Sequence, residues 1–284
     1  MSETSGAGTG DAAHEPTSDH EPASAHEPAS AHDATVRRSF GQQTRLFSGE
    51  TAVFAAPQAA PPPPWLGPLH SDMIVLDLAC GAGHLAEQVA PHVRQVVGID
   101  LTGPLLRLAA ERLAVAGITN VLLQEGNASA LPFLDGSFDL VLSRAALHHF
   151  PRPGAPVAEM VRVCRPGGAV AISDMIAPSA ELREPFDALH RKMDPSHASA
   201  LLYPELAELL RSELGELEHD EVVGPGSLPL ERILTDVADR DAVYADLRAE
   251  LAGGSPTGFG PTLTDGQIQV SFTTATFRAT KAAA

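Results

Sequence analysis

The strongest constraint on the fold is an alternation of apolar, strand-like segments with amphipathic, helix-like segments between residues 73 and 176. The helix-like segment 103–117, for example, carries Leu106, Ala109 and Leu113 on one face. Strands that alternate with helices pair in parallel and carry helices on both faces of their sheet. The chain is therefore predicted to be an α/β protein, with strands at 73–79, 95–100, 120–126, 137–143 and 167–174.

Shorter elements surround this core. Apolar residues spaced over 36–54 predict one or two short helices, and a stiff proline run follows that ends at Trp65. Later patterns predict helices at 202–215 and 228–254 and strands at 217–223 and 267–281. The expected organisation is a tail (1–35), lid helices with a proline-rich linker (36–70), a ligand-binding core (71–176), and cap helices with C-terminal strands that complete the sheet (177–284).

The tail repeats histidine with a period of six, at His14, His20, His26 and His32. Residues 1–35 contain no aromatic side chain, so they bury too little apolar surface to offset the entropy of ordering. A metal-binding tract would need imidazoles that converge on one ion, and this loose spacing favours a solvated tail instead. We predict a disordered low-complexity segment and no metal site.

Composition excludes several classes of partner. The formal net charge of −17 argues against a nucleic-acid or anionic membrane surface, because either would require clustered lysines and arginines. The two cysteines, Cys80 and Cys164, imply no disulfide framework. No apolar run approaches the length of a membrane span, and the N-terminus lacks the features of a signal peptide. The expectation is a cytoplasmic protein with one core, acting as a monomer or homodimer on a small molecule.

The loop ACGAGH, residues 79–84, follows the first strand at the edge where parallel sheets bind ligands. Gly81 and Gly83 have no side chain to block a ligand, and amides that open the next helix can face an anionic group. Asp100 ends the second strand 19 positions after Gly81, where a carboxylate can accept both hydroxyls of a ribose. These residues predict a site for an adenosine-like ligand.

A nicotinamide cofactor is one alternative, because GAGHLA also satisfies the pattern G-x-G-x-x-A with an acidic residue further on. Asp77 argues against it, since a carboxylate inside the strand suits the ammonium of an amino-acid moiety and repels a pyrophosphate. The two tyrosines, Tyr203 and Tyr244, also have no lysine shortly after them.

Two further segments decide between these cofactors. LPFLDGSFDLVLS (131–143) and VCRPGGAVAISD (163–174) resemble motifs of class I S-adenosylmethionine-dependent methyltransferases, in particular the ubiquinone/menaquinone-biosynthesis C-methyltransferase branch and its small-molecule relatives. The resemblance covers 36–281 and is strongest over 73–176. It implies a Rossmann-like, doubly wound and mostly parallel seven-stranded sheet with a helical cap, and S-adenosyl-L-methionine as the cofactor.

The resemblance also implies which residues contact the cofactor. Asp77 and the loop backbone would hold the methionine part, Asp100 the ribose, and Asn127 with Ala128 the adenine. Alanine at position 79 and asparagine at position 127 depart from the family's usual glycine and aspartate, and both replacements preserve the site. The implied set is Asp77, Ala79, Cys80, Gly81, Gly83, Asp100, Leu101, Asn127, Ala128 and Ser143.

Histidines near the same edge are the candidate catalytic groups. In SRAALHHF, His148 and His149 follow the fourth strand, where a base could deprotonate a phenol, enol or amine. A backbone contact for one and solvation of the other is the favoured alternative. His197, in KMDPSHAS, resembles a segment found in relatives, although Asp194 and Ser196 there also suit helix capping.

Three other features stay open at this stage. Arg144 is either a surface ion pair or an anchor for an acidic substrate. Phe40, Gln42 and Phe47 resemble the lid of these enzymes, and Phe259 is expected on the pocket wall. The predicted activity is methyl transfer to a carbon, oxygen or nitrogen of a small molecule such as a phenol, quinol or natural-product scaffold. The alternatives are a protein that binds the cofactor for cyclisation or regulation, and an NAD(P)-dependent oxidoreductase.

Overall fold

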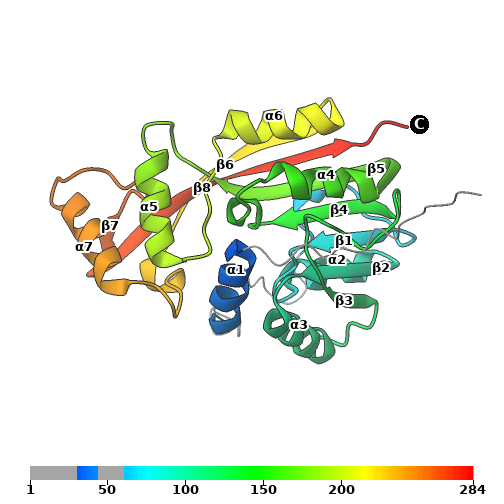
Figure 1. The fold of residues 1–284 in the computed structure, drawn as a ribbon, viewed down its shortest axis with the longest axis horizontal. Coiled ribbons are helices and arrows are strands. Elements are labelled where there is room, and N and C mark those ends of the chain that lie inside the picture. The colour runs from blue at the N-terminus through cyan, green and yellow to red at the C-terminus, as the bar shows by residue number, and fades with distance from the viewer. Residues whose placement is uncertain (1–30, 44–60, 284) are drawn as a thin grey trace, which may run out of the picture.

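The sheet predicted from the alternating segments forms the centre of the computed structural model, which describes residues 31–43 and 61–283 (Figure 1). Its strands follow the order β3-β2-β1-β4-β5-β8-β6, and β7 adds an eighth strand by pairing with β8. The α/β class and the mostly parallel, doubly wound sheet are confirmed. The strands are β1 (Ile74–Leu78), β2 (Gln95–Asp100), β3 (Val121–Glu125), β4 (Phe138–Arg144), β5 (Cys164–Ile176), β6 (His219–Pro229), β7 (Thr262–Thr264) and β8 (Gln267–Thr280).

The first five strands pair in parallel, and β8 runs antiparallel to β5, β6 and β7. Strand order reverses beside β1, which lies between β2 and β4, so the carboxyl ends of these strands surround the switch point where such sheets bind ligands. The helices of this half are α2 (His84–Val89), α3 (Gly103–Val115), α4 (Gly154–Val163) and the 3₁₀ turns η1 (Pro64–Leu66), η2 (Ala90–His92) and η3 (Leu147–His149).

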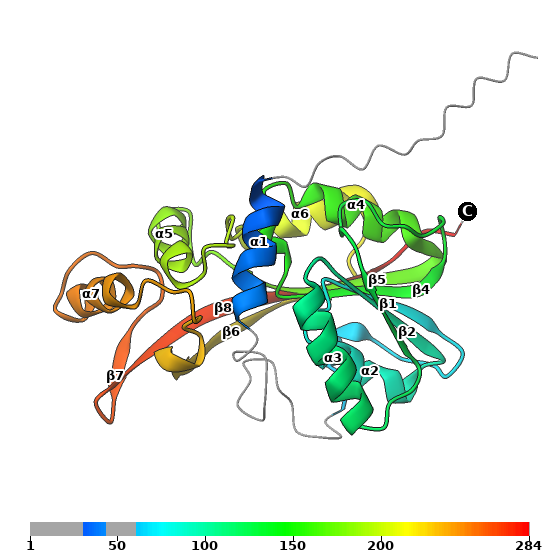
Figure 2. The same ribbon diagram turned by 60° about the horizontal axis from the view of Figure 1, so that its bottom comes forward.

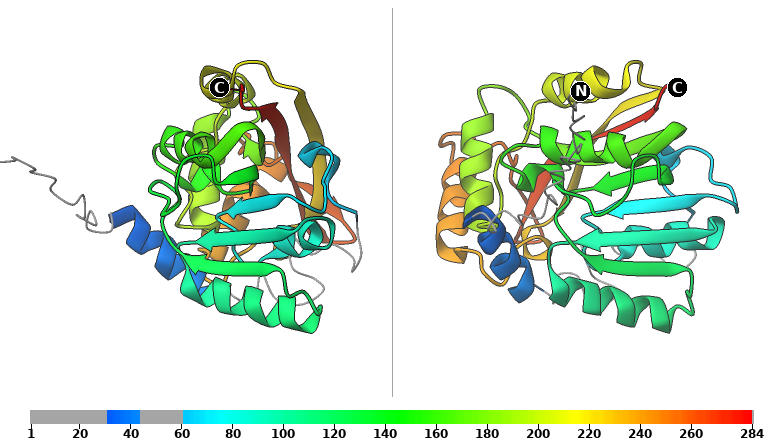
Figure 3. Two further views of the ribbon diagram at one scale, coloured as in Figure 1. Left: turned by 90° about the vertical axis from the view of Figure 1, so that its right-hand side faces the viewer. Right: turned by 45° about the vertical axis from the view of Figure 1, so that its right-hand side comes forward.

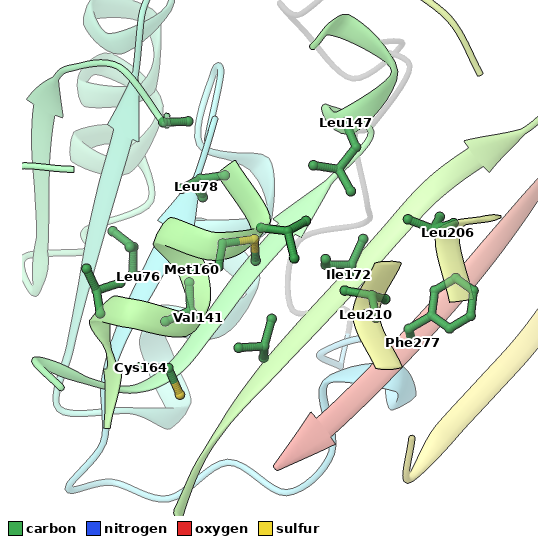
Figure 4. Close-up of a cluster of buried hydrophobic side chains, with 14 of the residues drawn as sticks. Leu76, Leu78, Val141, Leu147, Met160, Cys164, Ile172, Leu206, Leu210 and Phe277 are labelled. Atoms are coloured by element: carbon green, nitrogen blue, oxygen red, sulfur yellow. The ribbon is translucent and has the colours of Figure 1, made fainter. Parts of the chain in front are cut away.

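Alternate residues of β1 face opposite layers of the core. Leu76 and Leu78 pack with α4 and with α6 (Tyr203–Leu214), in the cluster that Figure 4 shows. Val75 packs instead with Leu85 and Val89 of α2 on the other face. Figure 2 shows the same layering, with α4 and α6 above the sheet and α2 and α3 below it. Both faces are therefore covered, as the continuous apolar strands predict.

The cap forms a third apolar cluster beside the sheet. It joins α5 (Arg183–Met193), η4 (Leu230–Arg232) and α7 (Arg240–Leu251) to the outer half of β8. The predicted helix over 228–254 is wrong in its first part, because residues 233–239 between η4 and α7 are not helical. Across the described parts of the chain, no helix is long and apolar enough to cross a membrane.

Helix α1 (Ala31–Gln42) lies between cap helix α5 and core helix α3 (Figures 1 and 3). It begins four residues before the predicted end of the tail, so the boundary at residue 35 falls inside a helix. Of the residues that resemble a lid, Gln42 is exposed, whereas its neighbour Gln43 is buried. Phe47 and residues 1–30, with the other tail histidines, lie outside the described residues.

Candidate active site

A cavity of about 1520 Å³ opens at the carboxyl ends of β1, β2, β4 and β5, roofed by α1 and bounded by the cap. Sites for one drug-sized ligand occupy roughly 300–1,000 Å³, so this space is large enough for a cofactor together with an acceptor. Among residues 31–43 and 61–283, no three histidine, cysteine, aspartate or glutamate side chains are placed to hold a metal ion.

The loop after β1 takes a sharp, left-handed path. Ala79, Gly81 and Gly83 have φ values of 55°, 53° and 74°, so the alanine adopts a backbone conformation that glycine would adopt without strain. Three amides of this loop donate within the protein: Cys80 to the Ile99 carbonyl (3.1 Å), Gly81 to Asp100 Oδ2 (2.8 Å) and Gly83 to the Cys80 carbonyl (2.9 Å). Hydrogen bonds from these three amides thus fix the path of the loop.

Asp77 supplies the test of whether the cavity suits the expected cofactor. The residue is 2% exposed, it lines the cavity, and its Oδ2 has no hydrogen-bond partner. Burial raises the pKa of Asp77 to about 7, although the nearby Arg144 opposes the rise. A buried acceptor without a donor is unfavourable until a ligand supplies one, and an ammonium group would do so.

Asp100 joins the ends of two strands. Its Oδ2 accepts from the Gly81 amide and its Oδ1 from the Thr102 amide, both at 2.8 Å. Burial raises its pKa against the effect of these amides. A carboxylate offers about four acceptor positions, so two remain for ribose hydroxyls. The Asn127 oxygen is also engaged, since it accepts from the Ser129 amide at 2.9 Å.

The structure brings most of the predicted site residues to this cavity. Its wall includes Asp77, Ala79, Cys80, Gly81, Asp100, Leu101, Asn127, Ala128, His148 and His149, and also Phe259 and Arg144. Gly83 instead packs under α3, where an added Cβ would lie 3.0 Å from that of Ala109. The Ser143 hydroxyl donates to the Leu78 carbonyl at 3.1 Å and ties β4 to β1. Neither Gly83 nor Ser143 lines the cavity.

His148 and Asp174 form a buried pair on the cavity wall. His148 Nδ1 lies 2.6 Å from Asp174 Oδ1, and the two side chains are 4% and 2% exposed. Asp174 Oδ2 accepts from the amides of Ala146 (2.8 Å) and Leu147 (2.6 Å). Burial by itself raises the pKa of Asp174, but His148 and these amides together hold it below its ordinary value. The carboxylate therefore keeps the imidazole proton on Nδ1 and leaves Nε2 as a proton acceptor.

Asp174 is the residue that the sequence analysis missed. It ends the segment VCRPGGAVAISD, which was used only as a family motif. Its position near the carboxyl end of β5, beside β4, was a usable signal, because the histidines follow β4 at the same edge.

His149 faces α1 and lies near the Asp194 carboxylate, which opposes the effect of burial on its pKa. Its Nδ1 lies 3.1 Å from the Ser196 hydroxyl, and its ring meets Phe40 edge-on with centroids 4.9 Å apart. Burial, followed by the neighbouring His148, lowers the pKa of His149 to about 3. The ring is neutral near neutral pH and a weak base.

His197 lies behind the wall, outside the cavity lining. Its Nε2 is 2.7 Å from Asp187 Oδ1, and its ring stacks on that of His190 with centroids 4.0 Å apart. The helix-capping interpretation of this segment is wrong, because α6 starts only at Tyr203. Asp194 instead closes a turn, and its Oδ1 accepts from the Ser196 amide at 2.9 Å.

The half of the cavity next to the cap is mainly apolar. Phe259 lies on this wall, as predicted, and stacks on Phe186 with centroids 4.5 Å apart. Thr235 and Thr274 supply hydroxyl groups there. The apolar lining comes from Met175, Met193, Ile233, Phe259 and Phe272.

Comparisons with known proteins agree with this site. Residues 76–172 match a family model described as a methyltransferase domain. The chain is 38% identical over 124 residues to the uncharacterized methyltransferase YcgJ of Bacillus subtilis (strain 168), a match that covers 43% of this chain and 49% of that protein. It is 33% identical over 149 residues to the ubiquinone/menaquinone biosynthesis C-methyltransferase UbiE of Shewanella pealeana, covering 49% and 59%.

The first curated relatives are matched over only 35% to 49% of their own length. Solved structures are matched more fully. The crystal structure of YcgJ has a TM-score of 0.65 at 26% identity, covering 76% of this chain and 94% of that one. A provisionally assigned methyltransferase from Bacillus halodurans C-125 gives 0.65 at 30% identity, covering 75% and 94%. The [4+2]-cyclase SpnF, at 17% identity and a TM-score of 0.61, shares the fold alone.

Proposed function

Because the chain belongs to the family of S-adenosylmethionine-dependent methyltransferases, we propose that it methylates a hydroxyl group of a small, largely apolar acceptor, with His148 as the base. The buried His148–Asp174 pair on the cavity wall carries this proposal. A carboxylate that fixes one imidazole nitrogen and leaves the other for proton transfer is the arrangement that general-base catalysis requires.

S-Adenosylmethionine is the cofactor of this family, and the residues at the carboxyl ends of β1 and β2 suit it. Asp77 would hold the ammonium group, Asp100 the ribose hydroxyls, and Asn127 with Ala128 the adenine. When bound, the cofactor supplies an electrophilic methyl group on a sulfonium. The nicotinamide alternative is wrong, since the family uses a different cofactor.

The chain's own contribution to the chemistry is alignment and proton removal. His148 Nε2 would take the proton of the acceptor hydroxyl, and Asp174 would stabilise the imidazolium that results. His149 is less suited to this role, because its pKa is about 3 and its Nδ1 faces Ser196. His197 is separated from the cavity by His190 and pairs with Asp187.

The lining near the cap supports the acceptor class. Met175, Ile233 and Phe272 suit an apolar ring system, and the hydroxyls of Thr235 and Thr274 suit a few polar substituents. A phenol, a quinol or a hydroxylated natural-product scaffold combines these features. An enol carbon or an amine would need the same base, so product analysis has to identify the methylated atom.

The experiment is a turnover assay with a panel of phenols, quinols and hydroxylated polycycles. The expected result is formation of S-adenosylhomocysteine together with an O-methylated product. Cofactor binding without S-adenosylhomocysteine formation across the panel would favour the alternative, a protein that binds the cofactor for cyclisation or regulation.

A further inference from the structure

His190 is an imidazole of the cavity wall that has no part in the chemistry proposed above. It lies in the last turn of cap helix α5, and it lines the same cavity as His148. The two ring centroids are 5.7 Å apart and the ring planes differ by 26°, so the rings lie nearly parallel. One imidazole from the core and one from the cap therefore border a single ligand space.

The His190 ring is held by three other rings. It stacks on His197, with centroids 4.0 Å apart and planes that differ by 17°. Phe186 and Phe259 meet it edge-to-face, at centroid distances of 5.8 Å and 5.9 Å. His197 is itself fixed, because its Nε2 lies 2.7 Å from Asp187 Oδ1. The orientation of the His190 ring is therefore set before any ligand binds.

Packing alone does not explain an imidazole at this position. The Nδ1 atom of His190 is buried and has no hydrogen-bond partner. A buried polar atom without a partner is unfavourable, and a phenyl ring would contact the same three rings without that cost. Burial, followed by the neighbouring His197, lowers the pKa of His190 well below its ordinary value. The ring is therefore neutral and offers one donor and one acceptor.

The buried nitrogen also indicates where the proton of His190 lies. A buried N–H without an acceptor is rarer in proteins than a buried acceptor without a donor, so the proton is favoured on Nε2. Because Nδ1 is buried, Nε2 is the nitrogen through which this ring can reach a ligand in the cavity. His148 is the opposite case, since Asp174 keeps its proton on Nδ1 and leaves Nε2 as an acceptor. The wall thus offers an acceptor and a donor to the same ligand.

We propose that His190 Nε2 donates a hydrogen bond to a second oxygen of the acceptor, on a carbon adjacent to the one that bears the methylated hydroxyl. The acceptor is then a ring with two neighbouring oxygens, one held by His148 and the other by His190. A hydrogen bond spans about 2.8 Å, so two nearly parallel rings 5.7 Å apart can each reach one of these oxygens. The inference rests on the proposed function, because it assumes a hydroxyl acceptor, and it specifies the class of that acceptor.

Calorimetric titration with three naphthalene derivatives tests the proposal on the unmodified protein. The protein is saturated with S-adenosylhomocysteine, so that binding is measured without turnover. The first derivative has one hydroxyl, the second has two hydroxyls on adjacent carbons, and the third has two hydroxyls on different rings. We expect the adjacent diol to bind roughly 5- to 30-fold more tightly than the other two, the range for one buried hydrogen bond. Equal affinities, or no binding of any derivative, would overturn the inference.

Variants then assign the preference to His190. His190→Phe keeps an aromatic ring among its three neighbours but removes both nitrogens, so the ratio of the affinities for the adjacent diol and the single hydroxyl should fall toward one. His190→Gln keeps an N–H group near the position of Nε2 and should retain part of that ratio. His92→Phe, on the exposed turn η2, is the matched control and should leave the ratio unchanged. A ratio that persists in His190→Phe would overturn the assignment.

Binding and turnover together separate this inference from the proposed function. If the adjacent diol binds preferentially through His190 but is not methylated when S-adenosylmethionine is supplied, the inference stands and the proposed reaction is wrong. If O-methylation occurs while the three affinities are equal, the reaction stands and the inference is overturned. If His190→Phe does not fold, His190→Leu, which also lacks the nitrogens, takes its place, with the same two outcomes.

Discussion

Asp174→Asn tests whether the base depends on its carboxylate partner. Asparagine has nearly the same size, and its oxygen can still accept from the amides of Ala146 and Leu147. Its NH₂ group, however, would replace the acceptor that now lies 2.6 Å from His148 Nδ1. The imidazole proton would then be favoured on Nε2, the nitrogen that has to receive the acceptor's proton.

The magnitude follows from what a general base contributes. Proton removal by a positioned side chain accelerates a reaction about 10²- to 10⁴-fold, which corresponds to roughly 3–5 kcal/mol of activation free energy. The His148 and Asp174 side chains are 4% and 2% exposed, so water cannot substitute for the lost contact. We therefore expect Asp174→Asn to lower the rate of methyl transfer by about 10²-fold or more.

The assay is single-turnover methyl transfer with an acceptor from the panel, with cofactor affinity measured separately by calorimetry. Affinity should change far less than the rate, because the base acts on the acceptor. Asp241→Asn, an exposed replacement on α7, is the control for the chemistry of the substitution. A rate for Asp174→Asn within about 3-fold of the unmodified protein would refute the assignment of the base.

Further outcomes follow from the other buried polar groups. Asp100→Ala should weaken cofactor binding far more than Asn127→Ala in calorimetry. A hydrogen bond to a charged group is worth about 1.5–3 kcal/mol, whereas a neutral one is worth about 1 kcal/mol. Equal losses of affinity would show that Asp100 does not face the ribose. Burial and His148 lower the pKa of His149 to about 3, below the unfolded value of about 6.5. The unfolded chain then binds the extra proton between these values, so below pH 6.5 the free energy of unfolding of the unmodified protein should fall by about 1.4 kcal/mol per pH unit relative to that of His149→Gln, a comparison in which the opposite contribution of Asp77 cancels. Equal pH slopes in the two proteins would contradict this. Ser39→Ala removes the hydroxyl that donates to Asp194 at 2.9 Å and should lower the urea unfolding free energy by about 1 kcal/mol; no change would mean that α1 is not anchored there.

The sheet could be predicted because the residues that specify each strand are close together in the sequence. Each strand of the parallel half is an apolar run flanked by turn residues, and the face each side chain takes follows from alternation, as with Val75 and Leu76 of β1. The cofactor loop was predictable for the same reason, since Asp77, Gly81 and Asp100 occur at short, characteristic spacings.

The rest of the site depends on contacts between distant segments. Asp174 is 26 residues from His148, and no periodicity links them, although parallel pairing of β4 with β5 brings both to one edge. Asp187 and His197 face one another only because the turn after α5 folds back. The break between η4 and α7 was missed because residues 233–239 keep apolar side chains at helical spacing while tertiary packing overrides that preference.

Replacement of His148 by glutamine is the most direct test of the central claim that this imidazole removes a proton during methyl transfer. The measurement is the single-turnover rate for the unmodified protein and for His148→Gln, at saturating cofactor. We expect the rate to fall by roughly 10²- to 10⁴-fold with cofactor affinity nearly intact. An unchanged rate would contradict the account, because another group would then have to remove the proton.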